Sequence, residues 1–202
     1  MRGGLVRMLN LSSQDVVATF GGRRFMDRAK PFQRVADVPS RPREQEFKFW
    51  PMSDSSKAFA FPIAVQGGRS YTVYVFEESG KLEWKLVSGE PRQAVGKNAM
   101  LQVVNLLGQG VEATVEAAVG GEKASAAAKA GMQSGDIGFA ATSIRVRVSA
   151  GGSEIASAEA ELEPEGAYSI IVYPDPKGRP AVHVYMNNPK MIATEAGASP
   201  VG

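Results

Sequence analysis

The sequence contains no cysteine and a single histidine among its 202 residues. The lack of cysteine excludes disulfides and thiolate metal sites, and a lone histidine excludes metal sites built on histidine clusters. The common catalytic motifs G-x-S-x-G, H-E-x-x-H, the P-loop and G-x-G-x-x-G are also missing. We therefore expect a protein that is not an enzyme and that uses no catalytic residue, metal or cofactor.

Long apolar runs are missing too, because no stretch approaches the roughly 18 residues that a membrane-spanning helix needs. The sequence thus predicts no membrane span. The opening residues Met1–Arg7 do not resemble a signal peptide, so the residues alone leave a cytosolic and an exported location open. Long amphipathic runs are scarce, and 22 glycines and 12 prolines favour many short strands joined by turns.

What the sequence does contain is an alternation of apolar and polar residues. The alternation is clear in Ile144–Val148 and in Leu82–Leu86. A period of two is typical of a half-buried strand, in which successive side chains point to opposite faces. Turn-forming residues recur between these segments, as in Gly21-Gly22 and Gly151-Gly152. This pattern predicts an all-β protein.

Two blocks of sequence occur twice in the same order. Val6–Leu11 resembles Leu101–Leu106 at a distance of 95 residues, and Gly68–Phe76 resembles Gly166–Tyr173. Two separated blocks in the same order indicate two copies of one domain.

The repeat predicts the domain organisation. We assign residues 1–93 to a first antiparallel β-sandwich and residues 98–190 to a second, and we expect residues 191–202 to form a flexible tail. Because each copy should have its own core, we expect a cut in the linker to give two soluble pieces. Glu122–Ala130 has the composition of a helix, but its place in the repeat favours an edge strand or a loop.

Some polar and aromatic residues keep equivalent places in both copies. Asn10 and Asn105 end the first strand of each copy, and Tyr71 and Tyr168 lie near the penultimate strand. An asparagine there can bind nearby backbone and fix a turn, and a tyrosine can tie a corner of a sandwich through its hydroxyl. We therefore expect these four residues to serve the fold.

Three other residues could serve either the fold or a site. His183 alternates with apolar neighbours, so we expect it on the outer surface of its strand. Trp50 and Trp84 occur only in the first copy. We expect them in the core, with stacking on a sugar ring as the alternative for an exposed tryptophan.

The net charge of +2 hides an asymmetry between the halves. Residues 1–95 hold 15 basic and 10 acidic residues, a net of +5, whereas residues 96–202 hold 8 and 11, a net of −3. The excess in the first half comes from one basic stretch, which is opposed locally by Asp27 and Asp37. The basic stretch contains Arg23, Arg24, Arg28, Lys30, Arg34, Arg41 and Arg43.

The basic stretch has two interpretations. One is a solvated loop and an edge strand that charge protects from aggregation. The other is a face that binds anions, because arginine pairs with carboxylates in a bidentate fork. Nucleic acid is not expected as the partner, since the second half is acidic and no aromatic-basic RNA motif is present.

The repeated strand pattern V-R-x-x-N-L-S-x-x-x-V, which runs from Val6 to Val16 with a second copy from Leu101, resembles the periplasmic accessory proteins of alginate O-acetylation, the AlgF-like family. The resemblance covers most of the chain and implies two sandwich domains in an exported, periplasmic protein without catalytic residues. It further implies partners in the polysaccharide O-acetyltransferase machinery, in the anionic polysaccharide, or in both. The longer arginine-rich region between Gly22 and Phe47 departs from the family pattern.

Two rival functions share the same sequence features. A cell-surface structural or adhesion module would show the same sandwiches, and a hydrolase or acyltransferase could assemble a site from residues distant in sequence. A gene beside membrane-bound O-acyltransferases would favour the accessory role, whereas a place in an adhesin cluster would favour the structural one.

Overall fold

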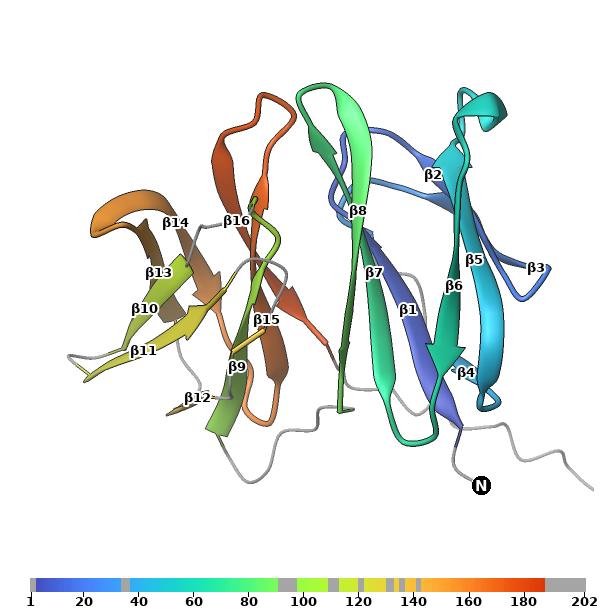
Figure 1. Ribbon diagram of the computed structural model, residues 1–202. Coiled ribbons are helices and arrows are strands. Elements are labelled where there is room, and N and C mark those ends of the chain that lie inside the picture. Colours follow the sequence, from blue (N-terminus) through green and yellow to red (C-terminus); the bar gives the residue numbers. More distant parts are fainter. Residues whose placement is uncertain are drawn as a thin grey trace, which may run out of the picture.

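The computed structural model describes residues 3–33, 37–90, 98–108, 113–119, 122–129, 133–134, 137–140 and 143–187. These residues form sixteen β-strands and one short 3-10 helix, η1 (Ser55–Lys57). The predicted all-β fold is confirmed, and Figure 1 shows the strands packed as stacked sheets. Residues 91–97 of the linker and the predicted tail at 191–202 lie outside the described residues.

Eight strands make up the first half of the chain. They are β1 (Gly4–Asn10), β2 (Val16–Phe20), β3 (Arg23–Ala29), β4 (Val38–Ser40), β5 (Arg43–Pro51), β6 (Phe59–Val65), β7 (Ser70–Glu78) and β8 (Lys81–Gly89). One sheet has the order β4-β1-β7-β8 and the other has the order β3-β2-β5-β6.

The other eight strands make up the second half. They are β9 (Asn98–Asn105), β10 (Ala113–Val119), β11 (Glu122–Ala128), β12 (Ile137–Ala140), β13 (Ser143–Ala150), β14 (Ser153–Glu161), β15 (Ala167–Pro174) and β16 (Pro180–Met186). Their sheets have the orders β12-β9-β15-β16 and β11-β10-β13-β14. These orders match those of the first half when eight is added to each strand number: β4-β1-β7-β8 corresponds to β12-β9-β15-β16, and β3-β2-β5-β6 corresponds to β11-β10-β13-β14. Glu122–Ala128 is therefore an edge strand, one of the two predicted alternatives.

The pairing includes one parallel contact in each half. β1 runs parallel to β7, and β9 runs parallel to β15, whereas the remaining pairs of described strands are antiparallel. Side chains alternate with the same period of two in both kinds of sheet, so the alternation in the sequence could not reveal this contact.

Each half has its own apolar core between its two sheets. In the first half Val6 and Met8 from β1 meet Phe47 and Phe49 from β5. In the second half the alternating residues of Ile144–Val148 point inward, with Ile144, Val146 and Val148 exposed by 1%, 0% and 0%. The alternation thus assigned the buried face of these strands correctly.

A third apolar layer joins the two halves. The sheet containing β7 faces the sheet containing β15, so the four sheets stack one behind another (Figure 1). β7 and β15 are consequently buried on both faces, and all eight residues of β15 are buried. This layer contains Leu9, Leu11, Tyr74, Phe76, Val87, Val104, Leu106, Ile171 and Tyr173.

The third layer is built from equivalent positions of the two halves. Leu9 and Leu11 lie 95 residues before Val104 and Leu106, and all four line the layer. Tyr74 on β7 and Ile171 on β15 form another such pair. A surface that meets its own equivalent is typical of a two-fold interface between subunits. Here the same arrangement occurs within one chain.

The two asparagines fix equivalent turns, as predicted. Both are fully buried. Asn10 Nδ2 donates to the carbonyl of Ala29 at 2.8 Å, and Asn10 Oδ1 accepts from the backbone N–H of Ser12 at 3.0 Å. Asn105 makes the corresponding bonds, to the carbonyl of Ala128 at 2.9 Å and from the N–H of Leu107 at 3.0 Å.

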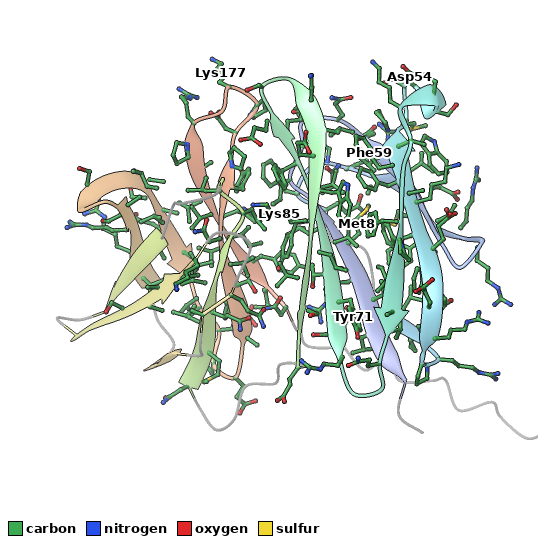
Figure 2. The ribbon with its side chains drawn as sticks, viewed as in Figure 1. Met8, Asp54, Phe59, Tyr71, Lys85 and Lys177 are labelled. Atoms are coloured by element: carbon green, nitrogen blue, oxygen red, sulfur yellow. The ribbon has the colours of Figure 1, made fainter. Side chains whose placement is uncertain are left out.

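The two tyrosines tie equivalent corners, which confirms their predicted role. The Tyr71 hydroxyl accepts from the backbone N–H of Gln66 at 3.0 Å, and the Tyr168 hydroxyl accepts from the N–H of Glu163 at 2.7 Å. Figure 2 shows Tyr71 and Met8 between the two sheets of the first half.

The structure corrects the expected surface position of His183. This residue faces away from its own core, as predicted, but the other half covers it. Its ring lies 5.1 Å from that of Phe32 and 6.5 Å from that of Tyr185. The side chain is therefore half-buried, because the third layer covers the face of β16 that would be wet in an isolated sandwich.

The two tryptophans have different surroundings. Trp84 stacks on Phe61 with ring centroids 3.6 Å apart and packs against the first core, as predicted. The expected core position is wrong for Trp50, which is half-buried and alternates with core residues on β5, so that it lies on the outer face of that strand. Lys48 Nζ on the same face lies 5.8 Å from its ring centroid.

Candidate functional site

An open groove of about 550 Å³ lies where edge strand β3 of one sheet faces edge strand β4 of the other. Figure 1 shows β3 at the edge of the first half that is farther from the second half. The groove is lined by Phe20, Gly21, Arg23, Arg24, Phe25, Val38, Pro39, Ser40, Arg41, Arg43 and Gln45. We refer to it as the basic groove.

A tight hairpin positions the arginines of the first wall. Gly21 and Gly22, with φ of 58° and 75°, connect β2 to β3. Two consecutive residues with positive φ are typical of the two-residue turn that matches the twist of a hairpin, and glycine adopts that conformation without steric cost. The turn places Arg23 and Arg24 at the start of the edge strand, where both side chains are exposed.

The second wall follows β4 and leads into β5. Gln45 on β5 donates a hydrogen bond through Nε2 to the Ser40 hydroxyl on β4, and this bond joins the two sheets at the groove. Arg41 and Arg43 lie on either side of the turn between these strands and are exposed. Arg43 Nη2 also donates a long bond of 3.4 Å to Gln45 Oε1.

Apolar side chains complete the groove. Phe25 is half-buried, and its ring packs edgewise against Phe20 at 6.3 Å and Phe47 at 5.5 Å between centroids. Phe47 belongs to the first core and is fully buried. The core therefore holds Phe25 in place while part of its surface faces the groove.

The groove is strongly positive. Four arginines line it, and no aspartate or glutamate is among its described lining residues. Arg24 forms an ion pair of 2.7 Å with Asp27, both exposed. Arg23 and Arg41 form no ion pair with any described residue, so a bound anion would meet at least two uncompensated guanidinium groups.

The structure separates Arg28 and Lys30 from this groove. Arg28 Nε pairs with Asp15 at 2.6 Å, and neither residue lines the groove. Lys30 follows the end of β3 and is also absent from the lining. Arg34 lies outside the described residues. Of the seven predicted residues, the structure thus brings together Arg23, Arg24, Arg41 and Arg43.

Sequence reasoning missed the uncharged part of the groove. Phe25 is the single aromatic residue of β3 and directly follows two arginines, and that contrast was a signal for an inward-facing aromatic. Pro39, Ser40 and Gln45 gave no such signal, because their place depends on the contact between two sheets.

Two other features, a metal centre and a membrane-spanning helix, were sought in the part of the chain that the structure describes. No group of three or more histidine, aspartate or glutamate side chains there could hold a metal ion. A search of the same residues for a helix with the length and hydropathy to cross a membrane finds none.

Comparisons with known proteins give little similarity. No protein-family model matches the chain, and no curated protein does. Among solved structures, a "putative cell adhesion protein" from Bacteroides ovatus aligns over 93% of this chain and 96% of its own, with 10% sequence identity and a TM-score of 0.29. A likeness at that level supports no conclusion about function.

Proposed function

We propose that the chain is a non-catalytic accessory protein that binds an anionic partner in the basic groove and serves the O-acetylation of an exopolysaccharide in the periplasm. The binding part rests on the lining of the groove, which has four arginines and no described carboxylate. The O-acetylation part rests on the strand pattern from Val6 to Val16 and its second copy, which resemble the accessory proteins of alginate O-acetylation.

The chemistry of the lining favours binding over catalysis. Arginine stays protonated in proteins and cannot serve as a general base. The hydroxyl of Ser40 in the lining accepts a hydrogen bond from Gln45 and has no histidine or carboxylate beside it in the lining. An activated nucleophile needs such a base. The groove can thus hold an anion but offers no group to transform it.

The expected affinity is modest and salt-dependent. Guanidinium groups bind carboxylates through paired hydrogen bonds, but each exposed contact contributes little and is screened by salt. Several contacts together would steer an anionic partner to the groove. A polyuronate carries one carboxylate on each sugar, and an acidic surface of an acetyltransferase could supply similar charges.

The binding part can be tested by titrating a polyuronate into the protein at two ionic strengths. We expect the double variant Arg23→Gln/Arg41→Gln to bind about tenfold more weakly, as two exposed charge contacts allow. Arg28→Gln is the matched control, because Arg28 lies on the same strand but pairs with Asp15 outside the groove. Equal binding by wild type and the double variant would support the other interpretation, in which the basic stretch is a charged, solvated edge without a binding role.

The O-acetylation part needs a separate test. Deleting the gene should lower the acetyl content of the exopolysaccharide, and a copy carrying His183→Ala should restore it if the role is not catalytic. Normal acetylation combined with loss of surface attachment would instead favour the adhesion role.

A further inference from the structure

Building on the proposed function, we infer that the occupant of the basic groove is a short uronate segment of the polysaccharide itself. Its carboxylates would lie against the arginines and one sugar ring would lie over Phe25. An acidic segment of a partner protein would offer the same charges, but the walls and the floor of the groove suit it less well.

The walls offer no template for a peptide strand. A peptide that joins a sheet edge needs a regular row of free N–H and C=O groups. β4 is three residues long with Pro39 at its centre, and proline has no N–H to donate. β3 shifts register against β2 on both sides of Ala18, and such irregular edges resist further pairing.

The floor offers a surface for a ring. Phe25 packs nearly perpendicular to Phe20 and Phe47, with interplanar angles of 80° and 70°, so the core restricts its orientation. A pyranose presents a face of C–H groups that can pack on an aromatic ring, which combines apolar contact with a specific geometry. A glutamate or aspartate side chain has no flat face of that kind.

The dimensions fit a few sugars. Two facing sheets lie roughly 10 Å apart, so a chain between β3 and β4 is within reach of arginines from both walls. The volume of about 550 Å³ lies inside the range of about 300–1,000 Å³ that is usual for small-molecule sites. A segment of two or three sugars would carry as many carboxylates, and these can meet Arg23 on one wall and Arg41 on the other.

Calorimetric titration with three matched probes tests this inference on the intact chain. The probes are a triuronate, the neutral trisaccharide obtained by reducing its carboxylates, and a triglutamate peptide. For wild type we expect the triuronate to bind about tenfold more tightly than the triglutamate, and the neutral trisaccharide to show no measurable binding. Phe25→Leu should weaken triuronate binding several-fold and leave triglutamate binding unchanged, since leucine is apolar but has no flat face.

Two controls separate recognition from folding. Phe25→Tyr keeps the ring and should bind the triuronate like wild type, and Arg28→Gln should do the same. Each variant should keep the wild-type unfolding midpoint to within a few degrees. If Phe25→Leu shifts the midpoint by more, the test rests on the relative affinities of wild type and Phe25→Tyr for the three probes.

The outcomes distinguish this inference from the proposed function. Equal affinity for triuronate and triglutamate, both lowered by Arg23→Gln/Arg41→Gln, would overturn the sugar assignment and leave an anion-binding groove. Failure of both carboxylate probes and of the full polymer to bind would overturn the groove as a binding site altogether.

Discussion

Lys85 and His183 occupy equivalent positions and both reach across the layer that joins the two halves. Lys85 on β8 lies opposite Tyr74, and His183 on β16 lies opposite Ile171. Lys85 Nζ donates to the backbone carbonyls of Leu106 and Leu107 in the second half, each at 2.9 Å. Figure 2 shows Lys85 between the two halves. His183 instead packs its ring against Phe32 of the first half.

Replacing Lys85 should weaken the contact between the halves. Lys85→Met keeps the apolar stem but leaves the two carbonyls without their donor, and we expect the free energy of unfolding to fall by about 1–3 kcal/mol. Chemical denaturation measures the change. Lys81→Met on the exposed end of the same strand is the control and should change stability by less than about 0.5 kcal/mol. Identical losses in the two variants would contradict a role for the bonds across the layer.

His183 should make stability depend on pH. Burial lowers the pKa of His183 below its usual value, so the folded state favours the neutral ring. The contribution of neutral His183 to stability is fully present above the pKa of this histidine in the unfolded chain, near 6.5. It is lost as the pH falls through the lower pKa of the folded state. The difference in unfolding free energy between pH 8 and pH 5.5 should therefore be smaller in His183→Gln than in wild type. An unchanged pH dependence would show that another group controls it.

Glu77 should contribute stability with a different pH range. Burial acts to raise the pKa of Glu77, but hydrogen bonds from the side chains of Gln14 and Ser13 and from the Ser13 N–H outweigh it, so the pKa lies below its usual value. The contribution of the Glu77 carboxylate to stability is present above its pKa in the unfolded chain, near 4.3. It disappears as the pH falls through the pKa of Glu77 in the folded state.

The corresponding variant is Glu77→Gln, which removes the charge but keeps the shape. We expect it to lower the free energy of unfolding by about 1–2 kcal/mol at pH 7 and by much less at pH 3. Glu78→Gln is the control, because the neighbouring side chain is exposed. A loss that persists undiminished at pH 3 would point to packing as the cause, with the charge playing no part.

Cutting the chain between its halves should not separate them. The two separate cores suggested two soluble pieces, but the third apolar layer buries nine further residues. After cleavage at a protease site placed within residues 91–97, we expect both pieces to elute together in size-exclusion chromatography. Ile171→Lys, at a position with 0% exposure in that layer, should release or aggregate them, whereas Ala60→Lys on the exposed face of β6 should not. Independent elution of the wild-type pieces would contradict a stabilising third layer.

The candidate site was partly predictable from the sequence. The clustering of arginines between Arg23 and Arg43 indicated positive potential, because the local acids were too few to balance it. Which arginines lie in one groove was not predictable. Arg28 forms an ion pair with Asp15, whereas Arg23 and Arg41, which are 18 residues apart, line the same groove. That choice depends on which edge strands of the two sheets face each other.

The sequence by itself determined the all-β fold, the inward faces of strands such as Ile144–Val148, and the turns held by Asn10 and Asn105, because alternation and hydrogen bonding to nearby backbone are local properties. Tertiary structure alone decided the parallel contact of β1 with β7 and the burial of β7 on both faces. An apolar run such as that of β7 is compatible with several partners on its second face. The partner is chosen by contacts between residues far apart in the chain, and those contacts also cover His183 and set two edge strands face to face around the basic groove.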